Sequence, residues 1–240
     1  MKVDLNSDLG EGESLARTRA LMHWITSANI ACGGHAGDVA SMTACVRLAL
    51  DYRVHIGAHP GGWNRANHGR GAVEIVPDEL ELLLLQQIGA LDRVARRQNA
   101  SLHHIKLHGA LYHAVESCAP LAKRYVEVVE RWWPKARIYA RANGQVAAIC
   151  RKRHVRFWEE GFLDRAYQPD GALVPRTMPG ALLTRATEVQ KRVEMWLRDG
   201  AIHTVTGTDL SLRIQTFCIH SDTPNAPQLA KIASKQLGLK

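Results

Sequence analysis

The sequence predicts an α/β protein with a mostly parallel sheet, and three observations support this fold class. Short apolar segments of strand character alternate with longer segments whose apolar residues recur at helical spacing. Such alternation is typical of a parallel sheet, either open or closed into a barrel. The chain has 240 residues, a length at which α/β barrels commonly form a single domain. Polar residues and glycines gather where the apolar segments end, as catalytic groups do in barrel enzymes.

Predicted strands and helices follow one another along almost the whole chain. The clearest helix start is Pro77, which suits a first helical turn, and Asp78 and Glu79 follow it at the positive end of the helix dipole. No linker, repeat or low-complexity segment divides the sequence, so we expect one domain over residues 1–240. The predicted strands are 2–6, 27–32, 54–58, 103–107, 136–140, 155–158, 202–206 and 214–219. The predicted helices are roughly 14–24, 38–52, 77–98, 118–132, 143–153, 186–198 and 225–237.

The composition is that of a globular protein with a sizeable core, because 46% of residues are apolar and 22% are charged. The formal net charge of +8 raises the question of nucleic-acid binding. However, the basic runs 96–97 and 151–153 lie at predicted helix ends, where cations favour the dipole, and no basic segment is interleaved with aromatic residues. We therefore expect no nucleic-acid partner, and attraction of anionic substrates explains the charge equally well.

The cysteines and the apolar segments bear on location. Five dispersed cysteines, an odd number without a Cys-x-x-Cys pair, favour a reducing compartment. The N-terminal segment lacks the apolar stretch of a signal peptide, and the longest apolar run, 82–85, is too short to span a bilayer. We expect a cytoplasmic location and no membrane partner.

The first predicted strand places polar residues on one face. Side chains alternate along a strand, so Asp4, Asn6 and Asp8 share a face, opposite Leu5 and Leu9. In an ordinary core strand each of these polar groups would need a buried partner. In a strand that lines a polar pocket they can face the pocket instead. We therefore count Asp4 and Asn6 among the candidate catalytic residues.

Two further strands lead into loops that carry histidine. After 27–32, two glycines precede His35, and glycine there lets the backbone approach a ligand closely. Asp38 follows, either as a site residue or as a helix N-cap. After 54–58, His59 opens a loop rich in glycine and proline that is a candidate lid.

The segment after residue 103 places Lys106 and His108 on one strand face, alternating with Ile105 and Leu107. A lysine at a barrel mouth can hold an anion or stabilise an oxyanion, and a histidine can act as a base or metal ligand. The alternative is a solvated strand edge, which would leave Lys106 on the surface.

The last two polar segments are candidates for substrate binding. Asp164 beside Arg165 fits a simple ion pair or a substrate contact, and Arg176 suits carboxylate recognition in a fork geometry. The final predicted strand leads to His220, and Asp222 is placed to orient this histidine or to cap the next helix.

Each of these signals is weak alone, but together they predict one pocket of acids, imidazoles and an ammonium. Such a mixture can bind a divalent metal or perform general acid/base chemistry. No fixed ligand spacing singles out a metal, so metal binding stays open, with Asp4, His35, His59 and His220 as candidate ligands. The sequence contains neither a Gly-x-x-x-x-Gly-Lys-[Ser/Thr] loop nor a Gly-x-Gly-x-x-Gly fingerprint.

These segments, in this order and over nearly the whole chain, resemble the LamB/YcsF family. The resemblance implies a seven-stranded (β/α) barrel-like fold related to glycoside hydrolase and deacetylase barrels. It also implies ATP-dependent opening of 5-oxo-L-proline to L-glutamate, as the A subunit of a 5-oxoprolinase complex with subunits B and C, with ATP and Mg²⁺ as cofactors. The matching segments are Asp4-Leu-Asn-Ser-Asp-Leu-Gly-Glu11, Asn29-Ile-Ala-Cys-Gly-Gly-His-Ala-Gly-Asp38, Gly57-Ala-His-Pro60, His108-Gly-Ala-Leu-Tyr112, Asp164-Arg165, Asp170-Gly-Ala-Leu-Val-Pro-Arg176 and Cys218-Ile-His220.

The chain departs from the family pattern mainly in the loop after Pro60. The family usually has Ser-x-Pro-Asp there, whereas this chain reads Gly61-Gly62-Trp63-Asn64 and loses a carboxylate at 64. His68, Leu107, His113 and Ser221 also replace the usual residues. The resemblance therefore implies the reaction class more firmly than the exact lactam.

The implied chemistry gives the candidates roles. A lactam amide is a poor electrophile, and phosphorylation of its oxygen by ATP would activate it for attack by water. On this hypothesis His35, His59 or Asp4 supplies the base, Lys106 and His108 hold the phosphorylated oxygen, and Asp164, Arg176 and His220 bind the substrate. Two alternatives remain: a stand-alone metal-dependent amidase or deacetylase, and a non-catalytic partner chain of the complex. A homo-oligomer is also open.

Overall fold

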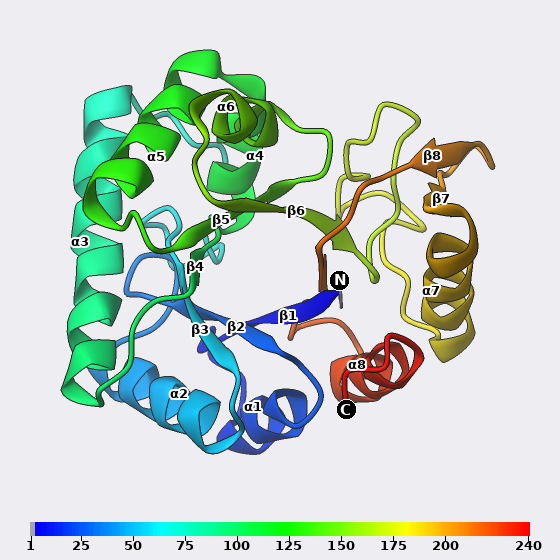
Figure 1. Ribbon diagram of the computed structural model, residues 1–240, viewed down its shortest axis with the longest axis horizontal. Helices are drawn as coiled ribbons and strands as arrows, with labels where there is room; N and C mark the ends of the chain where they lie inside the picture. Colours follow the sequence, from blue (N-terminus) through cyan, green and yellow to red (C-terminus); the bar gives the residue numbers. More distant parts are fainter. Residues whose placement is uncertain (1–2) are drawn as a thin grey trace.

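Seven parallel strands close into a barrel in the order β1-β2-β3-β4-β5-β6-β9 in the computed structural model, which describes residues 3–240 (Figure 1). The first and last of them are neighbours, with Asp4 of β1 beside Thr216 of β9. β9 also pairs with β6, where Phe162 lies beside Cys218, and this pairing closes the ring. The predicted seven-stranded barrel is confirmed. Its strands are β1 (Asp4–Leu9), β2 (Ser27–Ala31), β3 (His55–His59), β4 (His104–Ile105), β5 (Arg137–Arg141), β6 (Phe157–Phe162) and β9 (Thr216–Cys218).

Helices surround the barrel and cover its outer face (Figure 1). In α3 the apolar side chains of Leu80, Leu84, Ile88 and Leu91 recur every three or four residues and are buried. Asp38 caps α2, because its carboxylate accepts a hydrogen bond from the backbone N–H of Ser41. The helices are α1 (Leu15–Met22), α2 (Val39–Asp51), α3 (Pro77–Arg97), α4 (Gly109–Ser117), α5 (Ala119–Trp132), α6 (Gln145–Arg153), α7 (Ala186–Asp199) and α8 (Ala226–Gln236).

The structure differs from the sequence prediction at several places, of which the following matter most. The predicted strand 202–206 is instead a short antiparallel pair outside the barrel, formed by β7 (Ala201–His203) and β8 (Asp209–Ser211). Helix α4 was not predicted. Residue 2, the start of the first predicted strand, lies outside the described residues, and β1 continues to Leu9, beyond the predicted end at residue 6.

The interior of the barrel is polar, and its polar side chains lie at different depths. Asp4, Asn6 and Asp8 alternate along β1, and all three are buried. Asp8 lies near the carboxyl end of the strand. Asp4 begins the strand, so it lies at the amino end, opposite the expected pocket. The prediction that Asp4 belongs to the strand-end cluster is therefore wrong, because a period of two sets the face of a side chain but not its depth in the barrel.

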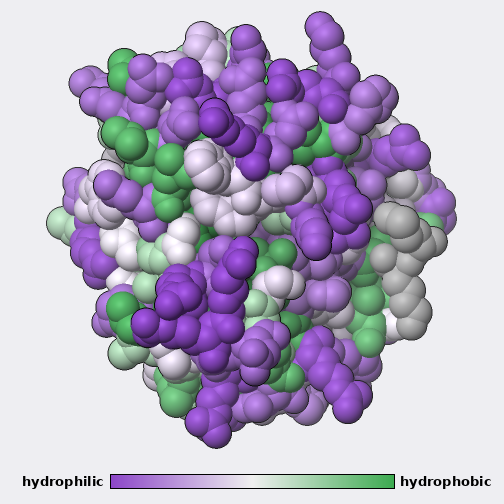
Figure 2. Space-filling view, turned by 60° about the vertical axis from the view of Figure 1, so that its left-hand side comes forward, coloured by the Kyte–Doolittle hydropathy of each residue, from purple (hydrophilic) through white to green (hydrophobic). Residues whose placement is uncertain are grey.

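The face shown in Figure 2 is largely hydrophilic, with apolar side chains scattered among charged ones. None of the helices in residues 3–240 combines the length with the apolar character needed to cross a membrane.

Candidate active site

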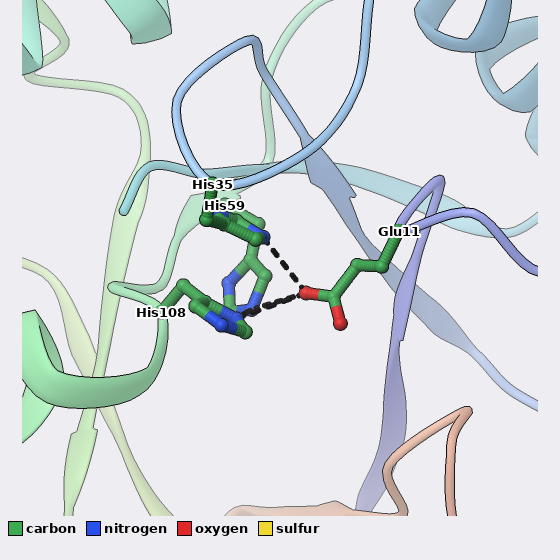
Figure 3. A group of neighbouring side chains, drawn as sticks. All are labelled: Glu11, His35, His59 and His108. Atoms are coloured by element: carbon green, nitrogen blue, oxygen red, sulfur yellow. Dashed lines mark hydrogen bonds and ion pairs between the residues drawn. The ribbon is translucent and has the colours of Figure 1, made fainter. Parts of the chain in front are cut away.

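Four side chains from different loops meet at the carboxyl end of the barrel (Figure 3). His59 ends β3, and His108 immediately precedes α4. His35 lies in the turn between β2 and α2, and Glu11 follows β1. The Oε1 atom of Glu11 lies 2.9 Å from His35 Nε2, 2.9 Å from His108 Nδ1 and 3.5 Å from His59 Nε2. One carboxylate oxygen therefore faces three imidazole rings.

Backbone carbonyls orient two of these rings. His59 Nδ1 lies 2.8 Å from the carbonyl oxygen of Lys106, and His108 Nε2 lies 2.8 Å from that of His68. A carbonyl can only accept, so both of these ring nitrogens carry the hydrogen and donate. In the neutral rings the other two nitrogens, His59 Nε2 and His108 Nδ1, are then bare acceptors, and they lie 3.0 Å apart.

The third ring is deeply buried. His35 stacks on His108, with ring centroids 3.6 Å apart. Burial lowers the pKa of His35 to about 4, although its hydrogen bond with Glu11 acts in the opposite direction. Burial opposes ionisation of Glu11, but the neighbouring imidazoles of His108 and His35 outweigh it and hold the pKa of Glu11 well below its usual value.

The loop after β3 packs directly on these rings, and glycines make the close approach possible. A Cβ at Gly61 would lie only 2.4 Å from His35 Nδ1 and 3.0 Å from the Cβ of His108. Gly69 has a φ of +64° and faces the same two histidines. The segment at 61–69, where the chain departs from the family pattern, therefore forms part of the wall around the cluster.

Beside the imidazoles lies a buried ion-pair group centred on Lys106. Its Nζ lies 2.9 Å from Asp8 Oδ1, 3.0 Å from Glu160 Oε1 and 3.1 Å from Cys218 Sγ. Burial disfavours the ammonium, but the nearby groups of Asp8, Cys218 and Glu160 outweigh this effect and raise the pKa of Lys106 well above its usual value. Burial opposes ionisation of Asp8 too, yet His59 and Lys106 lower its pKa. Lys106 is thus buried, not on a solvated strand edge, and its donors already face protein groups.

A histidine–aspartate pair completes the polar floor. His220 Nδ1 lies 3.0 Å from Asp164 Oδ1, and the backbone N–H of His220 donates to Oδ2 of the same carboxylate. Thr223 donates a third hydrogen bond to it. Burial would raise the pKa of Asp164, but His220 and Thr223 outweigh it and lower this pKa to about 2. Asp164 therefore orients His220 rather than pairing with Arg165, which donates to the carbonyl oxygen of Val174.

A cavity of about 710 Å³ opens over this floor, within the size range of small-molecule sites. Three arginines also line it. Arg70 and Arg176 both pair with Asp222, at 2.5 Å and 2.8 Å. Asp222 thus neither orients His220 nor caps a helix. The polar lining residues are Asp8, His59, Lys106, His108, Tyr112, His113, Ser117, Thr177 and His220, together with Arg70, Arg165 and Arg176.

The structure brings most of the predicted residues together and separates others. His59, Lys106, His108, Arg176 and His220 line the cavity. His35 lies behind it in the imidazole cluster, and Asp164 lies behind His220. Asn6 lies one layer deeper, where it donates to Glu160 and Thr216. Asp4 is at the other end of the barrel, bonded to Thr26, Ser27, Thr216 and Tyr139.

The residues that the sequence-based candidate set lacks include Asp8, Glu11, Glu160 and the cavity-lining Arg70. Asp8 shares the face of Asp4 and Asn6, so the alternation already pointed to it. Glu11 follows the strand and Gly10, a position that the turn made visible but that carried no periodic signal. Glu160 lies within β6, where nothing in the sequence distinguishes a buried acid from an exposed one.

Two groups of metal-ligating side chains are candidates for a metal site, and their surroundings favour one of them. Among residues 3–240, two groups offer three or more metal-ligating atoms within 4.8 Å of one another. In the group of Asp8, Cys218 and His220, the ammonium of Lys106 already lies against Asp8 and Cys218. The group of Glu11, His35, His59 and His108 holds no such internal cation. Of the four ligand candidates weighed from the sequence, it contains only His35 and His59.

Comparisons with known proteins agree with this architecture. The sequence model of the LamB/YcsF family matches residues 3–239. A protein of Pyrococcus furiosus, named as the A subunit of 5-oxoprolinase, is 40% identical over 240 residues, which are 99% of this chain and 94% of that protein. One of the same name from Pectobacterium atrosepticum is 38% identical and covers 99% and 93%. The crystal structure of a lactam utilization protein from Thermus thermophilus has a TM-score of 0.90 at 33% identity, covering 99% of this chain and 96% of that one.

Proposed function

This chain belongs to the LamB/YcsF family, and from that premise we propose that it is the ring-opening component of an ATP-dependent 5-oxoprolinase. The relatives named as 5-oxoprolinase subunits support a role in that system and the presence of partner chains. The proposed substrate is 5-oxo-L-proline, the product is L-glutamate, and the proposed partners are subunits B and C. Use of ATP with Mg²⁺ as co-substrate fits a cytoplasmic location.

One observation carries the proposal: a single cavity is lined both by acid/base groups and by arginines. A 5-oxoproline molecule has one carboxylate and one lactam carbonyl. In the proposed pose the carboxylate lies against Arg176 and Arg70, which suit a carboxylate in fork geometry. The lactam carbonyl then points to His59 and His108.

The proposed reaction proceeds in balanced steps. ATP phosphorylates the lactam oxygen and leaves ADP. Water adds to the activated ring carbon, the C–N bond breaks, and the nitrogen takes up a proton to become the α-amino group of glutamate. The acyl phosphate that remains reacts with a second water to give the γ-carboxylate and inorganic phosphate. Positioned proton donors and acceptors typically accelerate such steps by about 10²–10⁴-fold.

The geometry suggests a role for each floor residue. Of the three candidate bases, His59 lines the cavity, whereas His35 lies behind it and Asp4 at the far end. We assign the base to His59. His220, held by Asp164 through Nδ1, presents Nε2 to the floor and can protonate the departing nitrogen. Because the donors of Lys106 already face Asp8, Glu160 and Cys218, we assign Lys106 to holding Asp8 rather than to the phosphorylated oxygen.

The cluster of Glu11 and three histidines favours a second candidate, a metal-dependent amidase that needs no ATP. The two candidates differ in their requirement for nucleotide and partners. A non-catalytic role within the complex is a third, and it predicts that changes on the cavity floor leave the activity of the whole complex unaltered.

The decisive assay measures glutamate and inorganic phosphate formed from 5-oxoproline by this chain alone and with subunits B and C. We expect both products only with ATP and all chains present. Glutamate formation without ATP would favour the amidase. A fully active complex containing His59→Asn would favour the non-catalytic role, and His55→Asn, an exposed change at the start of the same strand, is the matched control.

A further inference from the structure

We propose that Glu11, His35, His59 and His108 form a binding site for one divalent transition-metal ion, with Zn²⁺ as the best match. The proposal starts from the hydrogen bonds that orient the rings. Because His59 Nδ1 and His108 Nε2 donate to the carbonyls of Lys106 and His68, the opposite nitrogens carry lone pairs. Ligating histidines usually have their second nitrogen held in this way.

Within residues 3–240, the donors around these lone pairs are too few to satisfy all of them. His59 Nε2 has three acceptors nearby: His108 Nδ1 at 3.0 Å, Asp8 Oδ2 at 3.4 Å and Glu11 Oε1 at 3.5 Å. A proton added to His59 Nε2 would point in one direction, so it could form a hydrogen bond with only one of these three acceptors. A cation at the centre attracts all of the lone pairs at once. The ring nitrogens and the carboxylate therefore match a metal ion better than a single proton.

The distances also match the size of such an ion. With Zn–N bonds of about 2.0–2.1 Å, the ligand atoms of a tetrahedral site lie about 3.3 Å apart. The separations around Glu11 Oε1 are 2.9, 2.9 and 3.5 Å, and His59 Nε2 and His108 Nδ1 are 3.0 Å apart. Because the His35 and His108 rings are stacked at 3.6 Å, one of them would have to turn for both lone pairs to point at the ion.

The donor set indicates which ion. Three imidazoles and one carboxylate suit Zn²⁺ or a neighbouring first-row ion, whereas Mg²⁺ prefers oxygen ligands. The site is thus distinct from any Mg²⁺ that accompanies ATP. His59 and His108 line the cavity, so the ion would lie at its floor. Polarising a lactam carbonyl or a water there is chemistry that such an ion supplies. That use rests on the proposed function, and it would pass the role of base from His59, whose Nε2 would then hold the ion, to a bound water. The presence of the site does not rest on that function.

The test measures metal directly and uses an untagged chain, because a histidine tag would bind the same ions. The purified protein is stripped with a chelator and titrated with Zn²⁺, or with Co²⁺ as a spectroscopic probe, by calorimetry and visible absorption. We expect one equivalent bound per chain and Co²⁺ absorption bands typical of mixed nitrogen and oxygen ligands. Absence of saturable binding of both ions by the folded chain would overturn the proposal.

Two variants remove one ligand atom each and keep the supporting hydrogen bond. His59→Asn retains an amide donor near Nδ1 for the carbonyl of Lys106, and His108→Gln retains one near Nε2 for that of His68. We expect each to weaken metal affinity by more than about 100-fold, beyond the loss usual for an outer-shell change. His55→Asn should bind like wild type.

Unaltered binding by both folded variants would refute this ligand set. Should a variant fail to fold, the titration of the wild-type chain still decides. The outcome is separable from the proposed function: metal binding without 5-oxoproline turnover keeps the site and removes the lactam reaction, whereas ATP-dependent turnover by a chain that binds no metal does the opposite.

Discussion

The two ends of the barrel both contain buried polar clusters, but the clusters differ in how their hydrogen bonds are matched. At the amino end, Thr26 and Ser27 donate to one oxygen of Asp4. Thr216 and Tyr139 donate to the other. At the carboxyl end, the acceptors of Glu11, His59 and His108 face one another. The first cluster is complete in itself, whereas the second needs something added.

This difference distinguishes polar clusters that stabilise the fold from polar clusters that bind a ligand, and it does so better than the types of residue in the cluster. Buried acids are present at both ends, so their mere presence says little. Where every acceptor has its donor, the cluster stabilises the fold and no cavity is needed. Where acceptors converge beside a cavity, the cluster can receive a ligand. Five substitutions test or sharpen this comparison.

The largest effect is expected from Lys106→Met. The change leaves the buried carboxylates of Asp8 and Glu160 without their cation, so we expect the free energy of unfolding to fall by about 3–5 kcal/mol. Urea denaturation followed by circular dichroism measures it, with the exposed Lys123→Met as control. Stability equal to wild type would mean that this ion-pair group contributes nothing to the fold.

Asp4→Ala tests the amino end. It leaves buried hydroxyl donors unsatisfied, which should cost about 3 kcal/mol of unfolding free energy. Turnover per folded molecule should stay at the wild-type level, because Asp4 does not reach the cavity. A variant that folds normally and loses turnover would show that Asp4 acts in catalysis, and it would contradict the difference that we draw between the two ends of the barrel.

The carboxyl end should respond in the opposite way. In the assembled complex, His59→Asn and His108→Gln are each expected to lower the turnover number by at least about 100-fold, equivalent to about 2.7 kcal/mol. Unfolding free energy should change by only about 1 kcal/mol. Steady-state kinetics and denaturation on the same preparations give both values. Large losses of stability with normal turnover would contradict the assignment.

Asp164 sharpens the comparison, because it lies at the carboxyl end yet its carboxylate oxygens both accept hydrogen bonds. Its folded pKa of about 2 lies below the usual value of 3.8, so its ionisation stabilises the fold above pH 4 by about 2 kcal/mol. This contribution falls away as the pH drops from 4 through 2. Asp164→Asn should therefore lose about that much stability at neutral pH and show a flatter stability profile between pH 4 and 2. A profile parallel to wild type would contradict this origin.

The sequence allowed the barrel and most of the floor to be predicted, for a physical reason. Parallel strands end on one side of a barrel, so Lys106, His108 and His220, which follow or lie near strand ends, had to converge. The resemblance to a known family then specified seven strands. The sequence predicts residues 202–206 as one of the main strands, whereas β7 pairs with β8 outside the barrel, because side-chain alternation does not indicate which sheet a strand joins.

The remaining features depend on distances that no local pattern encodes. The alternation that points Asp4 inward reports which way a side chain faces and not how deep it lies. Glu11 was missed because its role comes from the turn that follows Gly10, where hydrogen bonds from two backbone N–H groups to Glu13 shape the chain. The hydrogen bond by which Asp164 holds His220 likewise joins residues far apart in the sequence, so only the three-dimensional structure reveals it.

The neighbouring positions of β1 and β9 have a consequence for how the protein folds. Asp4 and Thr216 are separated by most of the chain, so the ring closes only when segments very distant in sequence meet. Until then β1 and β6 each present an open edge, which other chains can pair with. Cys218, which touches Lys106, also arrives with the last strand. The polar interior is therefore complete only once β9 has joined the barrel, and association of chains through the open edges is the hazard that this topology carries.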